Sequence, residues 1–434
     1  MQELAVTRCA SAHFRPDPRR VITKPFLPRE EIFPDGSTRM QLVLERLVAM
    51  PEQELASTLG AAHEAFAGRH RDLDATFERN FATVADHFDR HSLLDDGLTR
   101  ERRLLIGAYF THEYSIEAAA LGNPSMVPAP DQSGVEPGAL RFVMSLRGIG
   151  EGHVSSIEFR SGVVSADASI TIDTPSGFVA PGEAVGGPSD PESYAVSFPP
   201  AGDMSSRVLF PHSPAESHGL EDARFVRFVD DDANPAAYYA TYTAFDGHKI
   251  VPHLLETHDF TSFRATPLSG AAAKNKGIAI FPRRIAGQFV ALGRHDNVNN
   301  YVMTSHDVRV WDHAEMIQEP ERPWELMQLG NCGSPLETEY GWLVITHGVG
   351  PMRTYSLGAL LLDLDDPTRV IGHLREPLLS ANEDEREGYV PNVVYSCGGI
   401  IHAGNLILPY GYADVGASVA TVPVADLLKQ LTPR

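Results

Sequence analysis

The sequence predicts a mainly β-stranded protein, a five-bladed β-propeller, with an α-helical extension at its N-terminus. The first observation is a long series of short β-rich runs separated by turn residues, from Gly122 to about Pro423, which no long amphipathic helix interrupts. Such a series is typical of a sandwich, a barrel or a propeller, and roughly 300 residues suit about five four-stranded blades. The second observation is that apolar residues recur at intervals of three and four in residues 37–121, which indicates helices.

The helical region has recognisable helix starts. Ser37 or Thr38 can cap a first helix, Pro51 suits the start of a second, and another begins near Thr99. The clearest apolar stripe consists of Leu73, Phe77, Phe81, Val84 and Phe88. Helix packing explains such stripes, and a homo-oligomer interface through the same helices is compatible with it. The predicted domains are the helical extension (1–121), a catalytic propeller (122–423) and a short tail (424–434) with one helical turn.

Composition excludes several classes of partner. Aspartate and glutamate (57) outnumber lysine and arginine (36) in 434 residues, giving a formal charge of −21. This argues against nucleic acid and anionic membranes as partners, although one small anion needs only a few converging cations. Three widely spaced cysteines without a CxxC pair suggest a reducing compartment. The 18 histidines are scattered, so we expect no metal and no cofactor. With no signal-peptide or membrane-span pattern, we expect a cytoplasmic protein.

One central segment concentrates charge. In His218–Arg224 the adjacent carboxylates Glu221 and Asp222 lie between Gly219 and Arg224, and two strand-like runs follow. A flanking arginine can keep a carboxylate ionised or orient it. Taken alone, the segment is better explained as a solvated loop in which Arg224 forms a surface ion pair, because short charged clusters are usually solvated.

Further polar residues recur at the ends of predicted strands. They are Asn123, Arg147, Lys276, Arg294, His347, Tyr355 and Asp414. Singly, each is explained by a turn or a capped strand end. In a propeller, however, loops from successive blades converge on one mouth, so these residues can share a pocket. Lys276, Arg294 and His347 would then bring cationic donors together, which is what a phosphate or another oxyanion requires.

These motifs, in this order from Asn123 to Asp414, resemble glycoside hydrolase family 130, the β-mannoside phosphorylases and related mannosidases. Gly219–Arg224 resembles the family motif Gly-x-Glu-Asp-Pro-Arg, with Ala223 in place of proline. The other similar stretches are Lys276–Pro282 with Arg294, Gly341–Val349, Leu357–Pro367, Val390–Val394 and Tyr410–Asp414. Gln328 departs from the pattern, since many members have a lysine there.

The resemblance implies a five-bladed propeller and a role for each matched residue. Asp222 would be the general acid, with Glu221 as a partner of a sugar hydroxyl or a structural partner. Asn123, Arg147 and Asp414 match positions that hold the mannosyl unit. The positions that bind inorganic phosphate in the phosphorylases are matched by Lys276, Arg294, His347 and Tyr355. We expect Arg224 to orient the carboxylates without touching phosphate.

The function implied is inverting phosphorolysis of a β-mannoside, of the manno-oligosaccharide or mannosyl-glucose type, with inorganic phosphate as co-substrate and α-mannose 1-phosphate as product. The acid would act through a hydroxyl of the bound mannose. Two alternatives stay open: an inverting β-mannosidase on the same fold, with a glutamate as base, and a non-catalytic mannoside-binding propeller. Cations rather than glutamates at the matched positions favour phosphorolysis. The linkage and the second sugar do not follow from the sequence.

Overall fold

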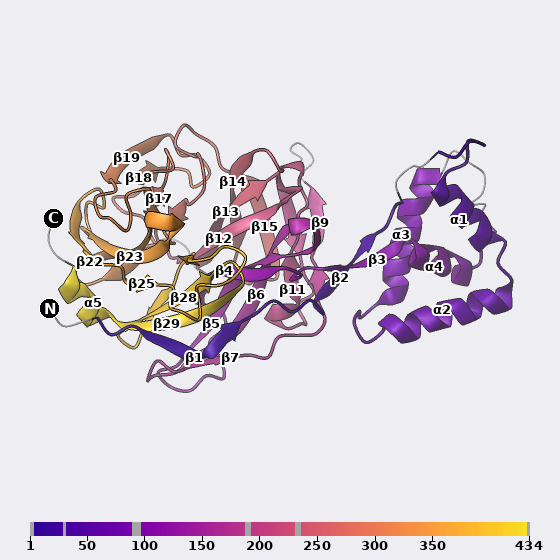
Figure 1. The fold of residues 1–434 in the computed structure, drawn as a ribbon, viewed down its shortest axis with the longest axis horizontal. Coiled ribbons are helices and arrows are strands. Elements are labelled where there is room, and N and C mark those ends of the chain that lie inside the picture. Colours follow the sequence, from indigo (N-terminus) through magenta and orange to yellow (C-terminus); the bar gives the residue numbers. More distant parts are fainter. Residues whose placement is uncertain (1–3, 29–31, 89–96, 187–191, 231–235, 432–434) are drawn as a thin grey trace. The chain divides into compact units, whose positions relative to one another are not determined.

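The computed structural model describes residues 4–28, 32–88, 97–186, 192–230 and 236–431. The chain divides into two compact units (Figure 1). A β-rich unit comprises residues 1–17, 117–176 and 180–434, and a helical unit comprises residues 18–116 with 177–179. In the described part of the chain, no helix is both long enough and apolar enough to cross a bilayer.

The β-rich unit begins with two antiparallel series of strands. The first series contains β4 (Ala120–Pro128), β5 (Leu140–Ile149), β6 (Ser155–Val164) and β7 (Ile170–Ile172). The second contains β12 (Gly219–Phe228), β13 (Ala237–Phe245), β14 (Ile250–Thr257), β15 (Ser262–Pro267), β10 (Tyr194–Ser197) and β9 (Glu183–Gly186). The parallel pair Gly219↔Ser155 joins the two series into one 12-stranded sheet, which also includes β11 (Arg207–Leu209) and β8 (Ala180–Pro181).

Three more sheets follow along the chain. One contains β16 (Ala279–Ile280), β17 (Phe289–Gly293), β18 (Asn300–Ser305) and β19 (His313–Gln318). The next contains β20 (Gln328–Asn331), β22 (Gly341–Val349), β23 (Tyr355–Leu362) and β24 (Val370–His373), with the short strands β21 (Leu336–Thr338) and β25 (Leu379–Ser380). The last contains β26 (Val394–Tyr395), β28 (Asn405–Tyr412), β29 (Gly416–Pro423) and β1 (Thr7–Phe14), with β27 (Ile400–His402) on β28.

The position of β1 differs from the sequence-based boundary at residue 121. The expectation assigned all N-terminal residues to the helical extension, but β1 pairs with the C-terminal strand β29. The strand was difficult to recognise because its register shifts between Arg8 and His13, which interrupts the alternation of buried and exposed residues. The helical unit is therefore an insertion after β1.

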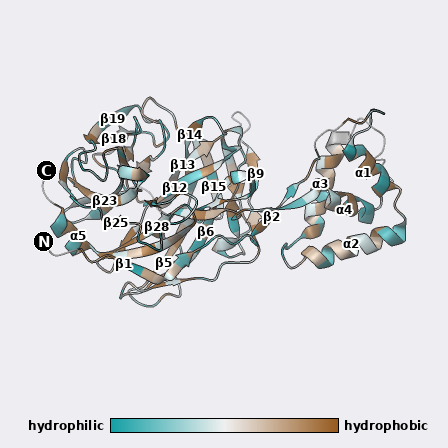
Figure 2. Ribbon diagram, viewed as in Figure 1, coloured by the Kyte–Doolittle hydropathy of each residue, from teal (hydrophilic) through white to brown (hydrophobic). Residues whose placement is uncertain are grey.

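The helical unit contains four helices and a two-stranded sheet. Their bounds are α1 (Arg39–Val48), α2 (Glu52–Phe66), α3 (Leu73–Phe88), α4 (Arg100–Tyr109), β2 (Val21–Pro25) and β3 (Thr111–Ser115). The predicted starts are confirmed, because the Thr38 and Thr99 side chains accept hydrogen bonds from backbone amides of α1 and α4, and Pro51 directly precedes α2. Helices α2 and α3 carry hydrophobic and hydrophilic residues on the same helix (Figure 2), and Leu73 and Phe77 enter a core with residues of the other helices.

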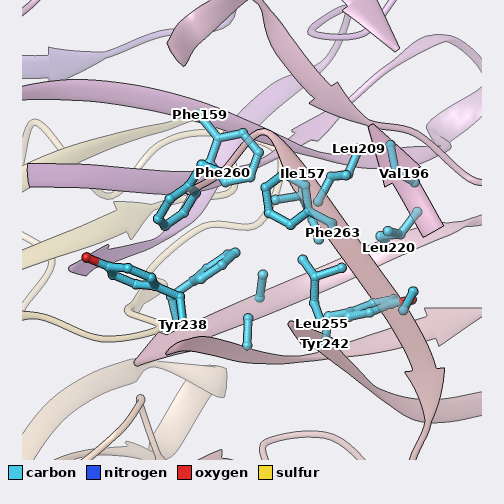
Figure 3. Close-up of a cluster of buried hydrophobic side chains, with 14 of the residues drawn as sticks. Ile157, Phe159, Val196, Leu209, Leu220, Tyr238, Tyr242, Leu255, Phe260 and Phe263 are labelled. Atoms are coloured by element: carbon cyan, nitrogen blue, oxygen red, sulfur yellow. The ribbon is translucent and has the colours of Figure 1, made fainter. Parts of the chain in front are cut away.

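Aromatic packing holds the strands that carry the site. Figure 3 shows Phe159, Phe260, Phe263 and Tyr238 in one buried cluster. The rings of Phe159 and Phe263 are stacked with centroids 5.8 Å apart, so β6 and β15 pack through them. Strand β22 is buried along its whole length, as expected for a strand covered on both faces. The predicted turn of helix in the tail is confirmed as α5 (Val424–Gln430).

Candidate active site

Three of the predicted site residues have left-handed backbone conformations. The φ angles are 48° at Asn123, 56° at Asp222 and 50° at Asp414. Asn123 and Asp222 each lie in a β-bulge, where the registers of β4–β5 and β12–β13 shift. A non-glycine residue in this region costs about 1–2 kcal/mol, and such residues persist where the surrounding structure holds them. A bulge changes the direction in which a strand residue points its side chain, and bulges are common beside active sites.

A carboxylate cluster forms around these bulges; we define it as Asn123, Arg147, Glu221 and Asp222. Asn123 Nδ2 donates to Asp222 Oδ1 at 2.5 Å, and Arg147 Nη1 lies 3.4 Å from the same oxygen. Arg147 Nη2 donates to Glu221 Oε1 at 2.6 Å, while Lys276 Nζ pairs with the other oxygen of Glu221. Each carboxylate of the cluster thus has a cation beside it. The residues of the cluster come from three strands, β4, β5 and β12, which contribute to one site.

Burial and the charges around this cluster shift the pKa values of two carboxyl groups, Asp222 and Asp414, in opposite directions. Burial raises the pKa of Asp222, but Arg147, Lys276 and the hydrogen bond from Asn123 outweigh burial and hold that pKa below its usual range. Burial raises the pKa of Asp414 and outweighs the Arg147 guanidinium, helped by the negative charge of Asp222. Asp414 lies in the hairpin between β28 and β29. Environments that push two carboxyl pKa values apart are a feature of acid–base sites.

A second group, which we call the cation cluster, consists of Arg224, Arg294, His347 and Tyr355. Arg294 Nη1 donates to His347 Nε2 at 2.9 Å. The His347 ring stacks on Tyr355 with centroids 6.1 Å apart and an interplanar angle of 12°. Lys276 and Asp414, which were also predicted, act on the carboxylate cluster. Among the described residues, no hydrogen bond joins one cluster directly to the other.

His347 differs from its expected role as a cationic donor. The side chain is fully buried, and burial together with Arg294 and Arg224 puts its pKa well below the usual value. The ring is therefore neutral at pH 7, and its Nε2 accepts a hydrogen bond from Arg294. The expectation of a third cation at this position is wrong. His347 instead orients the Arg294 guanidinium by accepting this hydrogen bond.

Arg224 also differs from its expected role. The side chain is 2% exposed, and it donates to the backbone oxygen of Asn331 at 2.8 Å and to the hydroxyl of Tyr395 at 2.6 Å. Among the described residues, no hydrogen bond joins it to Glu221 or Asp222, so the expectation that it orients them by contact is wrong. The register of β12 shifts between Glu221 and Arg224. Its effect on Asp222 is through charge alone.

Both guanidinium groups of the cation cluster have only neutral hydrogen-bond partners in the described part of the chain. Burying a charge without an opposite charge is costly, so this arrangement is suited to an incoming anion. Neither polar atom of the buried Asn331 amide has a partner among the described residues, and Arg294 Nε has none either. Buried polar atoms of this kind call for a ligand or a water.

Two residues of this region were not identified from the sequence. Asn331 directly follows Gln328-Leu329-Gly330, and Tyr395 directly follows the Val390–Val394 run. Their neighbours were noted, but neither residue type stands out in a strand. Only the pairing of β20 with β22 places Asn331 beside the strand that carries His347.

Comparisons with known proteins identify the family of the chain. The model of glycoside hydrolase family 130, described as β-1,4-mannooligosaccharide phosphorylase, matches residues 203–432. A 1,2-β-oligomannan phosphorylase from Thermoanaerobacter sp. (strain X514) is 32% identical over 231 residues, which is 52% of this chain and 75% of the relative. A β-1,2-mannobiose phosphorylase from Listeria innocua is 30% identical over 230 residues, which is 51% of this chain and 63% of the relative.

The fold is similar as well. The structure of the β-1,2-mannobiose phosphorylase from Listeria innocua in complex with β-1,2-mannobiose aligns with a TM-score of 0.51 and 20% identity, over 73% of this chain and 93% of that one. The family match includes Asp222, Lys276, Arg294 and Asp414 but not Asn123. Asn123 nevertheless donates a hydrogen bond to Asp222. The chain belongs to glycoside hydrolase family 130.

Proposed function

We propose that this enzyme cleaves β-mannosides by inverting phosphorolysis and releases α-mannose 1-phosphate. The observation that carries the proposal is the contrast within the site. Arg224 and Arg294 are guanidinium groups with only neutral partners, and they accompany a carboxylate pair that has its own cations. Membership of the family and the phosphorylase names of its relatives support the same reaction.

We also propose that the β-rich unit is a five-bladed propeller. Five antiparallel series follow one another along the chain, beginning with β4, β12, β16, β20 and β26. Strand β1 would complete the last blade by pairing with β29, so the two ends of the unit meet in one sheet. In this arrangement the first strand of each blade lines the centre, which is where Asn123 and Asp222 lie on β4 and β12.

The proposed chemistry needs one acid and no protein base. Phosphate is itself an anionic nucleophile, so cations that orient it take the place of a base. Lys276 and Arg294 would hold the phosphate, with His347 fixing the Arg294 guanidinium and Tyr355 donating its hydroxyl. One phosphate oxygen forms a bond to the anomeric carbon while the glycosidic bond breaks on the opposite face. Phosphate attacks from the α face, opposite to the leaving oxygen, and so gives the α-anomer from a β-mannoside.

Asp222 would supply the proton to the leaving oxygen through a hydroxyl of the mannosyl unit, which passes on its own proton and receives one from the carboxyl. For this role Asp222 must be protonated, although the unliganded site holds its pKa low. A phosphate dianion on Lys276 would offset part of the positive charge that lowers this pKa. Phosphate binding and acid protonation are thus coupled in the proposal.

The mannosyl unit would be held by the residues around Asp222. Asn123 donates to Asp222, Arg147 lies beside both carboxylates, and the charges of Arg147 and Asp222 act on Asp414. Glu221 accepts from Arg147 and Lys276, so its role in the proposal is to position these two cations. Hydroxyl groups of a sugar offer both donors and acceptors, which suits a site of mixed charge.

The test is the phosphate dependence of cleavage on a panel of β-1,2-, β-1,3- and β-1,4-linked mannobioses and mannosyl-glucose. The β-1,2 linkage comes first because two relatives carry it in their names. Phosphorus NMR should show α-mannose 1-phosphate appearing only when phosphate is supplied. Equal sugar release without phosphate would establish a hydrolase instead. Binding without turnover of any substrate would establish a non-catalytic protein.

A further inference from the structure

Lys276 lies in a bend of the chain between β15 and β16. Residues 275–277 belong to no strand, and we call them the Lys276 bend. The φ angles are 63° at Asn275 and 94° at Gly277, so a left-handed residue lies on each side of the lysine. In the described part of the chain, no backbone–backbone hydrogen bond involves the three residues of the bend. The position of the bend therefore depends on contacts made by side chains.

The side chain of Asn275 ties this bend to the β17–β18 hairpin. Its Nδ2 donates to His295 O at 2.6 Å and lies 3.5 Å from Arg294 O. Asparagine also adopts left-handed backbone more readily than most residues, because its short amide can hydrogen-bond locally. Asn275 thus combines the backbone angle of the bend with a donor that anchors it. One amide links the segment that carries Lys276 to the segment that carries Arg294.

The side chain of Arg294 is fixed at its far end. It lies across Gly330, where an added Cβ would be 2.2 Å from Arg294 Cδ and 2.6 Å from His347 Cε1. Gly330 is paired with His347 in the β20–β22 ladder, and Arg294 Nη1 donates to the imidazole of that histidine. Because glycine has no side chain, the guanidinium can reach His347. With the guanidinium held there, its distance from Lys276 depends on the bend.

The other hydrogen bonds of the bend point away from this hairpin. Lys276 Nζ pairs with Glu221 of the carboxylate cluster, and Gly277 O accepts from Arg224 Nη1 at 3.4 Å. Among the hydrogen bonds that the described residues make to the bend, only those of the Asn275 amide reach the hairpin that carries Arg294. Without this amide, the bend would be held toward the carboxylate cluster alone.

We propose that Asn275 is a positioning residue for phosphate, which keeps Lys276 at the distance from Arg294 that one phosphate requires. Two cations bind the same phosphate strongly only when both reach its oxygens at once, and a small displacement of one of them loses much of this advantage. Asn275 acts through the lysine and need not touch the anion. The inference rests on the proposed function, because it concerns how the phosphate-binding cations of that function are held.

The test measures phosphorolysis by the full chain, on the β-mannoside that the parent cleaves best, over a range of phosphate concentrations. Asn275→Gly retains the left-handed backbone and removes the amide. Asn275→Asp retains the size of the side chain but puts an oxygen in place of the donor. Each should lower kcat/KM for phosphate about tenfold, as expected for a misplaced cation, and leave the KM for the β-mannoside at saturating phosphate within about threefold.

Asn405→Gly is the matched control. Asn405 Nδ2 also donates to a backbone oxygen, that of Ala403 at 3.0 Å, but it lies at the start of β28, whereas Asp414 follows the end of that strand. This variant should have the kcat/KM of the parent for phosphate. Unchanged values in both Asn275 variants would overturn the inference and leave the proposed function intact.

A double-mutant cycle separates positioning from a general loss of structure. In an Arg294→Met background the second cation is missing, so the position of Lys276 relative to it no longer matters. Asn275→Gly should then lower kcat/KM for phosphate less than twofold, against about tenfold in the parent. Equal factors in the two backgrounds would contradict a positioning role. Thermal unfolding of each variant shows whether any loss comes from folding.

Calorimetric titration of inorganic phosphate decides the inference independently of turnover. If the parent cleaves β-mannosides equally well without phosphate, the proposed function fails. The inference still predicts that Asn275→Gly binds phosphate about tenfold more weakly than the parent and Asn405→Gly do. Equal binding in Asn275→Gly and the parent, or no binding in the parent, would refute the inference.

Discussion

The carboxylate cluster and the cation cluster balance their charges in opposite ways. In the carboxylate cluster, Glu221 is paired with Arg147 and Lys276, and Arg147 also approaches Asp222. In the cation cluster, Arg224 and Arg294 donate to backbone oxygens, to a phenol, to an amide and to a neutral imidazole. In the first cluster the carboxylates are paired with cations, whereas in the described part of the chain no carboxylate hydrogen-bonds to the two guanidinium groups of the second.

Two hairpins with the same local pattern show how this difference arises: Arg147-Gly148-Ile149-Gly150 in β5–β6 and His347-Gly348-Val349-Gly350 in β22–β23. Arg147 and His347 occupy the same place in the β5–β6 and β22–β23 hairpins, but one is a cation between carboxylates and the other a neutral acceptor for Arg294. The same backbone therefore carries a cation paired with a carboxylate in one sheet and a hydrogen-bond acceptor for an arginine in another. Each prediction below breaks or sharpens this contrast, from the largest expected effect to the smallest.

Asp222→Asn should have the largest effect, because the amide cannot supply the proton for the leaving oxygen. We expect kcat for phosphorolysis to fall about 1,000-fold, within the range for loss of a general acid. Phosphate affinity should not fall, since the cation cluster is untouched and the loss of a negative charge near Lys276 favours an anion. Steady-state kinetics on β-mannobiose measures both quantities. Asp365→Asn, at an exposed turn, is the control and should behave as the parent. Retention of most activity in Asp222→Asn would mean that another group is the acid.

Arg294→Met should act on phosphate and spare the sugar. Removing the guanidinium takes away a charge-assisted bidentate donor, so the KM for phosphate should rise about 100-fold. The KM for β-mannobiose at saturating phosphate should change less than threefold. Arg369→Met is the matched control, because Arg369 is an exposed arginine near Asp363. A larger effect on the sugar than on phosphate would contradict the division into two clusters.

Glu221→Gln breaks the balance of the carboxylate cluster and should cost stability. The substitution leaves Arg147 and Lys276 without their carboxylate in a largely buried site, so the free energy of unfolding should fall by about 3 kcal/mol. Urea unfolding at low phosphate measures the change, with Glu337→Gln at the exposed Arg283 pair as control. Added phosphate should restore part of the loss by pairing with the freed lysine. A variant as stable as the parent would show that the cluster is not charge-balanced by Glu221.

His347→Gln should have the smallest effect, and it depends on pH. The pKa of His347 is lower in the folded than in the unfolded chain, so between about pH 6.5 and the folded pKa only the unfolded chain takes up the proton. This weakens folding as the pH falls and has no effect at pH 7.5. The variant has no histidine to take up this proton. Its free energy of unfolding relative to the parent should therefore rise by about 1 kcal/mol between pH 7.5 and pH 5.5. A constant difference across this range would contradict a neutral His347.

The sequence was informative about elements and less so about boundaries. Thr38, Thr99 and Pro51 marked helix starts because capping and proline act locally. The assignment of β1 failed because its partner, β29, is at the other end of the chain, and a register shift hides the alternation within β1 itself. Pairing over such a separation leaves no local pattern to recognise.

For the site, residue types pointed to the chemistry but not to the protonation states. His347 counts as a cation by its type, yet burial and two arginines keep it neutral. Arg224 was assigned to the adjacent carboxylates because they are neighbours in sequence, but in the fold it donates to Asn331 and Tyr395. Asn331 has no distinguishing context in the sequence, and its unpartnered amide is visible only in the fold.

The most direct test of the contrast between the clusters is calorimetric titration of inorganic phosphate into the protein at saturating mannose. We predict one phosphate site per chain, abolished in Arg294→Met and retained in Asp222→Asn, with an affinity that falls as ionic strength rises. Absence of phosphate binding in the parent protein, or equal binding in Arg294→Met, would contradict the assignment of the Arg294 guanidinium to the co-substrate.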